Sequence, residues 1–127
     1  MRDHTKLRAF QLADALALAV YGGTVDFPVP ERFGLTSQLR RAAVSVASNI
    51  VEGCARGSEA DYLRFLDMAY GSARELEYQL SLAVRLGYLT ESRHDQLANQ
   101  CSETGKVLGG LIRALRKPRS KPSPSPP

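Results

Sequence analysis

The most constraining feature of this 127-residue chain is the stretch from Leu35 to Leu89, which contains no proline. Its apolar residues recur in alternating steps of three and four, the spacing that places them on one face of an α-helix. Thr36 is the expected N-cap of the first helix. Gly53 ends that helix, and Ser58 is the expected cap of the next one. The stretch therefore predicts two long helices packed as an antiparallel hairpin.

Two further helices are predicted beside this hairpin. Residues 6–25 carry apolar side chains at helical spacing, and Pro28 and Pro30 prevent that helix from continuing. The segment after Thr90 has a pattern of the same kind, and Thr90 is the expected cap of its helix. Four helices with apolar stripes and short turns are typical of an antiparallel, up-down-up-down four-helix bundle. We therefore expect an all-α fold with residues 1–115 as its single domain.

Glycine is unusually frequent inside the last two predicted helices, at Gly71, Gly105, Gly109 and Gly110. An interior glycine costs a helix about 1 kcal/mol relative to alanine. Because glycine has no side chain, we expect neighbouring helices to approach closely at these residues.

The net charge of +4 is concentrated at the C-terminal end. Without the four cations of residues 116–127, the rest of the chain has as many basic as acidic residues. This segment also holds five of the seven prolines, so we expect a disordered basic tail. Contact with phosphates and a simple contribution to solubility are both open explanations for its charge.

The composition argues against membrane insertion and export. Hydrophobic residues make up 43% of the chain, but no run approaches the roughly 20 apolar residues that span a bilayer. The first ten residues carry charges where a secretory signal needs an apolar core. A cytoplasmic protein is the expectation.

Residues that carry catalysis are sparse. Helical bundles hold di-metal centres with Glu-x-x-His pairs, but His4 and His94 are isolated. The sequence has no phosphate-binding loop, nucleophile elbow or Cys-x-x-Cys motif. Cys54 and Cys101 are expected to be small buried groups. We therefore expect no metal, no cofactor and no enzymatic activity.

A second stripe on the third predicted helix is apolar at both ends and polar in the middle. Its polar members are Ser72, Glu75 and Gln79. Either this stripe is a subunit interface or its middle faces water at the edge of the bundle. In an antiparallel hairpin Glu75 would approach Gln38 and Arg41, which predicts a buried or interfacial ion pair.

The end of the second predicted helix carries two further polar residues. Asn49 and Glu52 are expected to satisfy backbone groups of the turn that follows.

Several motifs in the sequence, taken together, resemble those of a known protein family. They are FPVPERFGLTSQLRRAAVSVASNIVEG at 27–53, which contains SNI-x-EG, then R-x-S at 56–58 and GSARELEYQL at 71–80. The sequence resembles the four-helix-bundle proteins encoded within intervening sequences of bacterial 23S ribosomal RNA genes. The resemblance extends from Leu7 to Leu115.

This resemblance implies a small cytosolic bundle that assembles as a homopentameric ring, without a known reaction. The family is related in shape to the accessory variability proteins of diversity-generating retroelements. Those proteins bind a reverse transcriptase and nucleic acid through a basic surface. A nucleic-acid-binding role, with a protein such as a reverse transcriptase as a further partner, is therefore the leading hypothesis.

Basic side chains that would contact RNA or DNA are spread along the chain. The densest pair is Arg40-Arg41, and Tyr78 lies on one outward stripe with Arg74 and Arg85, which suits charge and stacking. Asp67 and Glu77 lie near that stripe, so ion pairs within the chain are the alternative. The candidates are Arg40, Arg41, Arg56, Arg64, Arg74 and Arg85, with Lys117, Arg119 and Lys121 in the tail.

Two non-enzymatic functions thus remain open. One is a nucleic-acid-binding accessory ring. The other is a scaffold or assembly module that binds protein without touching nucleic acid.

Overall fold

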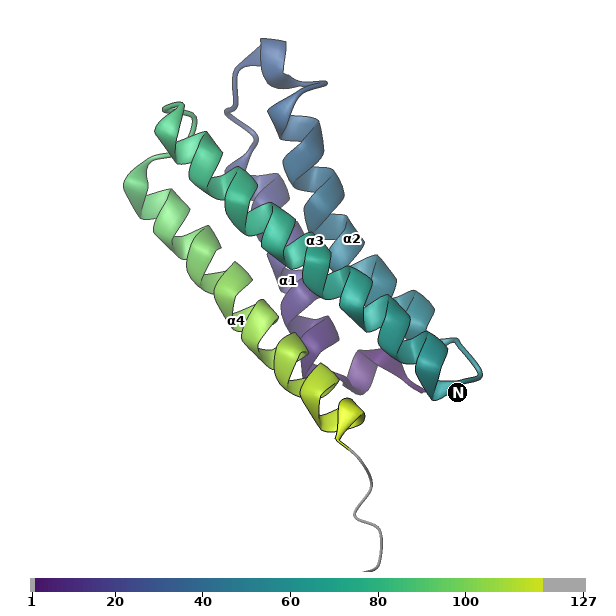
Figure 1. Ribbon diagram of the computed structural model, residues 1–127. Coiled ribbons are helices and arrows are strands. Elements are labelled where there is room, and N and C mark those ends of the chain that lie inside the picture. Colours follow the sequence, from purple (N-terminus) through teal and green to yellow (C-terminus); the bar gives the residue numbers. More distant parts are fainter. Residues whose placement is uncertain (1, 118–127) are drawn as a thin grey trace, which may run out of the picture.

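The computed structural model describes residues 2–117, which are all-helical, with no strand in that range (Figure 1). Four α-helices lie alongside one another as a four-helix bundle. None of the described helices is long and apolar enough to cross a membrane. The elements are η1 (His4–Lys6), α1 (Arg8–Gly23), η2 (Val29–Glu31), α2 (Leu35–Cys54), α3 (Glu59–Arg85) and α4 (Glu91–Arg116).

The core runs along the bundle between the four helices. Helices α1 and α3 each pack against both α2 and α4. The core side chains form two clusters, and each cluster takes residues from every helix. One contains Leu16, Leu39, Leu76, Leu80 and Leu97, and the other contains Ala13, Val46, Ile50, Leu66 and Leu108. These residues hold the apolar positions of the stripes that predicted the helices.

Helices α2 and α3 meet along a seam of paired contacts. Arg41 is paired with Glu75, with 2.5 Å between Nη2 and Oε2, and Ser45 shares a 2.8 Å hydrogen bond with Ser72. At the far end of the seam, Gly53 lies against Phe65. The contacts advance along α2 while they recede along α3, so these two helices run in opposite directions, as predicted for the hairpin.

Side-chain caps begin two of the helices as predicted. The Oγ of Ser58 accepts a hydrogen bond from the backbone N–H of Asp61 at 3.1 Å. The Oγ1 of Thr90 accepts one from Arg93 N–H, also at 3.1 Å. Both hydroxyls thus satisfy donors that the first helical turn leaves free.

The predicted cap Thr36 is wrong. Helix α2 begins at Leu35, the residue before Thr36. The Glu31 carboxylate accepts a hydrogen bond from Leu35 N–H at 2.9 Å. Because the preceding η2 turn brings this carboxylate over the end of α2, no hydroxyl cap is needed. Thr36 instead lies within the first turn, buried.

The close approach expected at the interior glycines is also wrong at two positions. No neighbouring atom lies within 4 Å of the place where a Cβ would stand on Gly71 or Gly105. Gly109 does support a contact, because its added Cβ would be 3.4 Å from the Tyr70 ring.

Gly53 lies in close contact with α3, which predicts a specific cost of substitution. In Gly53→Ala the new Cβ would stand 3.0 Å from Phe65 Cβ and 3.2 Å from Tyr62 Cδ1. Overpacking of this kind costs about 1–3 kcal/mol, so we expect urea denaturation to show a loss of this order. The matched control Gly71→Ala, which meets open space, should gain up to about 1 kcal/mol. Equal stability of the two variants would contradict the importance of this contact.

Candidate nucleic-acid interface

The loop between α1 and α2 is held in place at both ends. Phe27 is buried, and its ring centroid lies 5.6 Å from that of Tyr88. The Tyr88 hydroxyl donates to the Glu31 carboxylate at 3.3 Å, the same carboxylate that caps α2. Since Pro28 and Pro30 fix the backbone between these anchors, the loop has little freedom.

This anchored loop presents Arg32 and Phe33 to solvent. The Phe33 ring is 89% exposed, although phenylalanine is usually buried. The Arg32 guanidinium lies 5.8 Å from the Phe33 ring centroid, within the range of a cation–π contact. A held loop with an outward aromatic ring is an arrangement that suits contact with another molecule.

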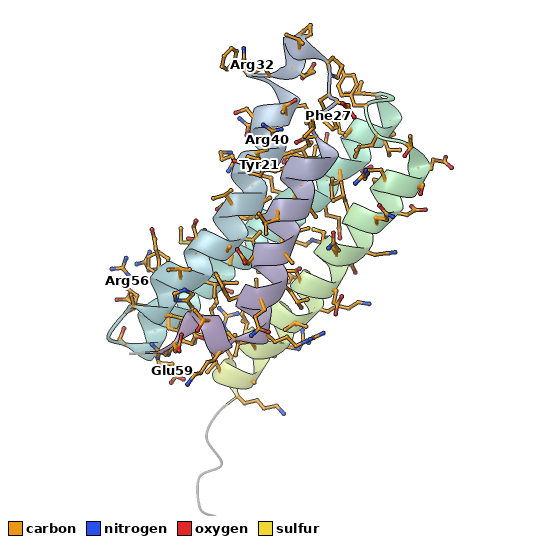
Figure 2. The ribbon with its side chains drawn as sticks, turned by 180° about the vertical axis from the view of Figure 1, so that it is seen from behind. Tyr21, Phe27, Arg32, Arg40, Arg56 and Glu59 are labelled. Carbon is orange, nitrogen blue, oxygen red and sulfur yellow. The ribbon has the colours of Figure 1, made fainter. Side chains whose placement is uncertain are left out.

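Arg40 extends this surface from α2 towards the end of α1. Its Nε donates to Thr24 Oγ1 at 2.9 Å, and its guanidinium carbon lies 4.7 Å from the Tyr21 ring centroid. Figure 2 shows Tyr21, Arg40 and Arg32 at the same end of the bundle. These side chains line one shallow hollow of about 400 Å³, which we call the arginine–aromatic patch. Its residues are Tyr21, Arg32, Phe33, Thr36, Ser37, Arg40 and Arg41.

The patch carries positive charge that the protein does not neutralise locally. Within residues 2–117, neither Arg32 nor Arg40 has a carboxylate within 4.0 Å. Arg41 is paired with Glu75, but the two side chains are 49% and 42% exposed. Exposed pairs of this kind contribute about 0–1 kcal/mol, so exchanging Glu75 for a phosphate costs little.

Thr36 adds a polar group at the base of the patch. Its side chain is more than nine-tenths buried, and its Oγ1 has no hydrogen-bond partner among the described residues. Thr36 lines both the patch and an adjoining hollow that reaches Phe27. A buried hydroxyl without a partner typically costs about 1–3 kcal/mol, so the fold bears this cost directly beneath the patch.

The seam confirms part of the prediction for Glu75. Arg41 donates from Nη2 to Glu75 and from Nε to Gln38 Oε1, at 3.0 Å for the latter, so the three side chains do converge. Within the chain the ion pair is exposed rather than buried. Ser72 bonds to Ser45 and Glu75 to Arg41, so these two members of the stripe face α2. Gln79 Nε2 donates to Glu75 within α3 at 3.4 Å.

The prediction for Asn49 is wrong. Its Nδ2 donates backwards along α2, to the carbonyl and hydroxyl of Ser45, at 2.9 and 3.0 Å. The following turn uses backbone acceptors instead, because Ala55 N–H donates to the Glu52 carbonyl. The Glu52 side chain is exposed beside the groove between α1 and α2.

Two predicted basic residues lie at the opposite end of α2. The guanidiniums of Arg56 and Arg64 lie 4.5 and 4.7 Å from the Phe65 ring centroid. Arg64 is also 3.7 Å from Asp61. Figure 2 shows Arg56 far from Arg32 along the bundle. These arginines therefore do not belong to the patch.

The remaining predicted residues are also dispersed. Arg74 lies 3.6 Å from Glu77, and Arg85 Nε donates to the Ser81 carbonyl at 3.2 Å. Tyr78 is 60% exposed on α3. Lys117 follows the end of α4, and Arg119 and Lys121 lie outside the described residues.

One residue of the expected tail is part of the bundle. Helix α4 includes Arg116, whose guanidinium pairs with Asp67 on α3. This pairing holds the last turn of α4 against α3.

The seven predicted basic residues that lie within residues 2–117 thus do not form one surface. Of these seven, Arg40 and Arg41 contribute to the patch. Phe33 and Tyr21, its aromatic members, were not predicted as site residues, because helical periodicity says nothing about the loop and placed Tyr21 on an apolar face. The sequence signal that could have indicated this surface is the closeness of two prolines, at 28 and 30, to Arg32 and Phe33.

The groups that carry catalysis or bind metal are not brought together. Residues 2–117 contain no group of three or more His, Cys, Asp and Glu side chains that could hold a metal ion. Both cysteines are free and buried, as predicted. The Cys101 thiol donates to the Ala73 carbonyl, and burial raises its pKa to about 12, so it is a neutral thiol.

These features define a class, a small four-helix bundle with an arginine–aromatic surface. The sequence model of the 23S rRNA-intervening sequence protein family matches residues 5–110, and the chain belongs to this family. The resemblance noted in the sequence is thus confirmed.

A solved structure shares the fold. It is the crystal structure of a protein with unknown function from the S23 ribosomal protein family of Bacteroides thetaiotaomicron. The two chains are 25% identical, with a TM-score of 0.77 over 83% of this chain and 95% of that one. A search of curated proteins found no match.

Proposed function

We propose that this protein is a non-catalytic, cytoplasmic accessory protein that binds single-stranded RNA or DNA through the arginine–aromatic patch. The observation that carries the proposal is that two arginines without an acidic partner among the described residues lie beside exposed aromatic rings. Arg32 and Arg40 have no carboxylate partner in the described chain, and they lie beside Phe33 and Tyr21. Proteins bind single strands by combining charge along the backbone with aromatic rings on which bases stack.

The geometry gives each group a role. A base stacks on the exposed face of Phe33, and the guanidiniums of Arg32 and Arg40 donate to neighbouring phosphates. Arg40 is held by Thr24 and Tyr21, and the loop is held by Phe27 and its prolines. Because these groups are already ordered, binding loses less conformational entropy than it would on a flexible loop.

The proposal includes a homo-oligomeric ring of up-down-up-down bundles. The opposite directions of α2 and α3 support the helix order. An exposed groove between α1 and α2 supports the assembly, because Phe10, Val44 and Val51 line it beside Glu52. Ring contacts join two different surfaces of neighbouring subunits, so such a groove needs a complementary face elsewhere.

A protein-binding scaffold is the second candidate. The observation that favours it is the exposure of aliphatic side chains on and next to α1. Leu18, Val25 and Val29 are each largely exposed. A partner of the reverse-transcriptase type would cover them by apolar contact, with little dependence on salt.

The ring predicts a mass. The chain has a mass of 13.9 kDa, and light scattering coupled to size exclusion should give about five times this value for the purified protein. A single-chain mass at all concentrations and salt conditions would contradict the ring. Binding through the patch is tested separately, by the affinities below.

Binding through the patch predicts a matched set of affinities. We expect Phe33→Ala to weaken binding of a fluorescein-labelled 12-nucleotide single strand by about 1–3 kcal/mol, the value of one base-stacking contact. Arg32→Ala should lower the salt slope of log Kd by about 1, because one phosphate contact is lost. Fluorescence anisotropy titrations between low and moderate salt measure both effects.

Tyr78→Ala and Arg85→Ala are the matched controls, since these exposed side chains lie on α3 outside the patch. Both should retain the original affinity and salt slope. Equal losses in the control variants, or no effect of Phe33→Ala, would overturn the assignment. Salt-insensitive association with a protein instead would favour the scaffold.

A further inference from the structure

A separate hollow of about 250 Å³ lies between α3 and α4, which Figure 1 shows side by side. It shares no residue with the arginine–aromatic patch. Its floor consists of small side chains and its walls carry charge and one aromatic ring. The floor contains Ala73, Cys101, Ser102, Gly105 and Gly109, and the walls contain Tyr70, Arg74, Glu77, Lys106 and Arg113.

The walls of this hollow carry an excess of positive charge. Arg74 lies 3.6 Å from Glu77, the one acid in the lining. Lys106 and Arg113 have no carboxylate within 4.0 Å in the described part of the chain. They stand seven residues apart on α4, which places them on the same face of that helix two turns apart. Two cations without acidic partners thus border a concave surface.

The floor is kept open by glycine at a position where helix packing does not require it. Nothing lies within 4 Å of a Cβ added to Gly105, so an alanine there would project into open space. Glycine is among the least favourable residues inside a helix, and alanine the most favourable. Glycine at this position therefore leaves the hollow deeper than alanine would, at a cost in helix stability.

The aromatic wall and the floor are well defined. At Gly109 an added Cβ would stand 3.4 Å from both the Tyr70 ring and Arg113 Nη1, so these three groups are already in contact range. The Cys101 thiol at the floor donates to the Ala73 carbonyl at 3.3 Å. Because that thiol is neutral and occupied, it adds no negative charge to the floor.

We infer that the α3–α4 hollow binds a phosphate group with at least two anionic oxygens, held by Lys106 and Arg113 over the Gly105 floor. A guanidinium offers two parallel donors to such a group, and an ammonium offers a compact charge beside it. The group belongs either to a small phosphate compound or to the phosphorylated end of a nucleic acid. The inference does not rest on the proposed role of the arginine–aromatic patch.

Isothermal titration calorimetry of the full chain with inorganic pyrophosphate at low ionic strength tests this inference. We expect saturable binding with one site per chain. Lys106→Ala and Arg113→Ala should each weaken it at least about tenfold, in line with loss of one charge-assisted contact. The matched control Lys6→Ala removes an exposed lysine outside the hollow and should change nothing.

Gly105→Ala separates ligand binding from stability. This variant should raise the unfolding temperature, because alanine favours the helix, while it weakens pyrophosphate binding by filling the floor. No saturable heat, or undiminished binding by Gly105→Ala and Lys106→Ala, would overturn the inference. Phe33→Ala should leave pyrophosphate binding unchanged, so failure of the patch and failure of this site are distinguishable.

Two oligonucleotides identify the source of the group. A 5′-phosphorylated single strand that binds more tightly than its 5′-hydroxyl counterpart, with the difference abolished by Lys106→Ala, assigns the site to nucleic-acid ends. Saturable pyrophosphate binding without such a difference assigns it to a small phosphate compound.

Discussion

The close approach of α2 to α3 at Gly53 is the constraint on which the rest of the bundle depends. An alanine Cβ would stand 3.0 Å from the Phe65 Cβ, an atom fixed to the α3 backbone, so only a shift between the helices would admit it. Along the same seam, Ser45 meets Ser72 and Arg41 meets Glu75. These polar contacts keep the register that the glycine contact permits. The register in turn fixes where the first turns of α2 stand relative to the α1–α2 loop.

Two groups of arginines in this protein differ in their partners. Arg8, Arg41 and Arg116 join helices through carboxylates, on Glu103, Glu75 and Asp67 respectively. Arg32 and Arg40 lie near aromatic rings and have no acidic partner in the described chain. Since the first kind already has acidic partners within that part of the chain and the second kind has none there, net charge alone does not locate a binding surface. The distinction depends on partners, which only the folded arrangement supplies.

The sequence predicts the helices well because their stripes are long and regular. Ser58 and Thr90 were identifiable as caps because a hydroxyl stands just before each periodic segment. Thr36 was misread because the competing cap, Glu31, comes from a turn that periodicity does not describe. The binding residues were harder to predict, since heptad position gives a residue's face on its own helix but not the neighbour that it meets. The spacing of Lys106 and Arg113 places them on one face of α4, but the hollow that they border forms only where α3 lies beside α4.

The most direct test of the central claim maps where a single strand touches the protein. The full chain is irradiated with a single-stranded RNA that contains 4-thiouridine, and the cross-linked peptides are identified by mass spectrometry. The account predicts adducts at Phe33 or Tyr21, the aromatic residues of the patch. Adducts confined to Tyr70 and Tyr78 on α3, with none at Phe33 or Tyr21, would contradict it.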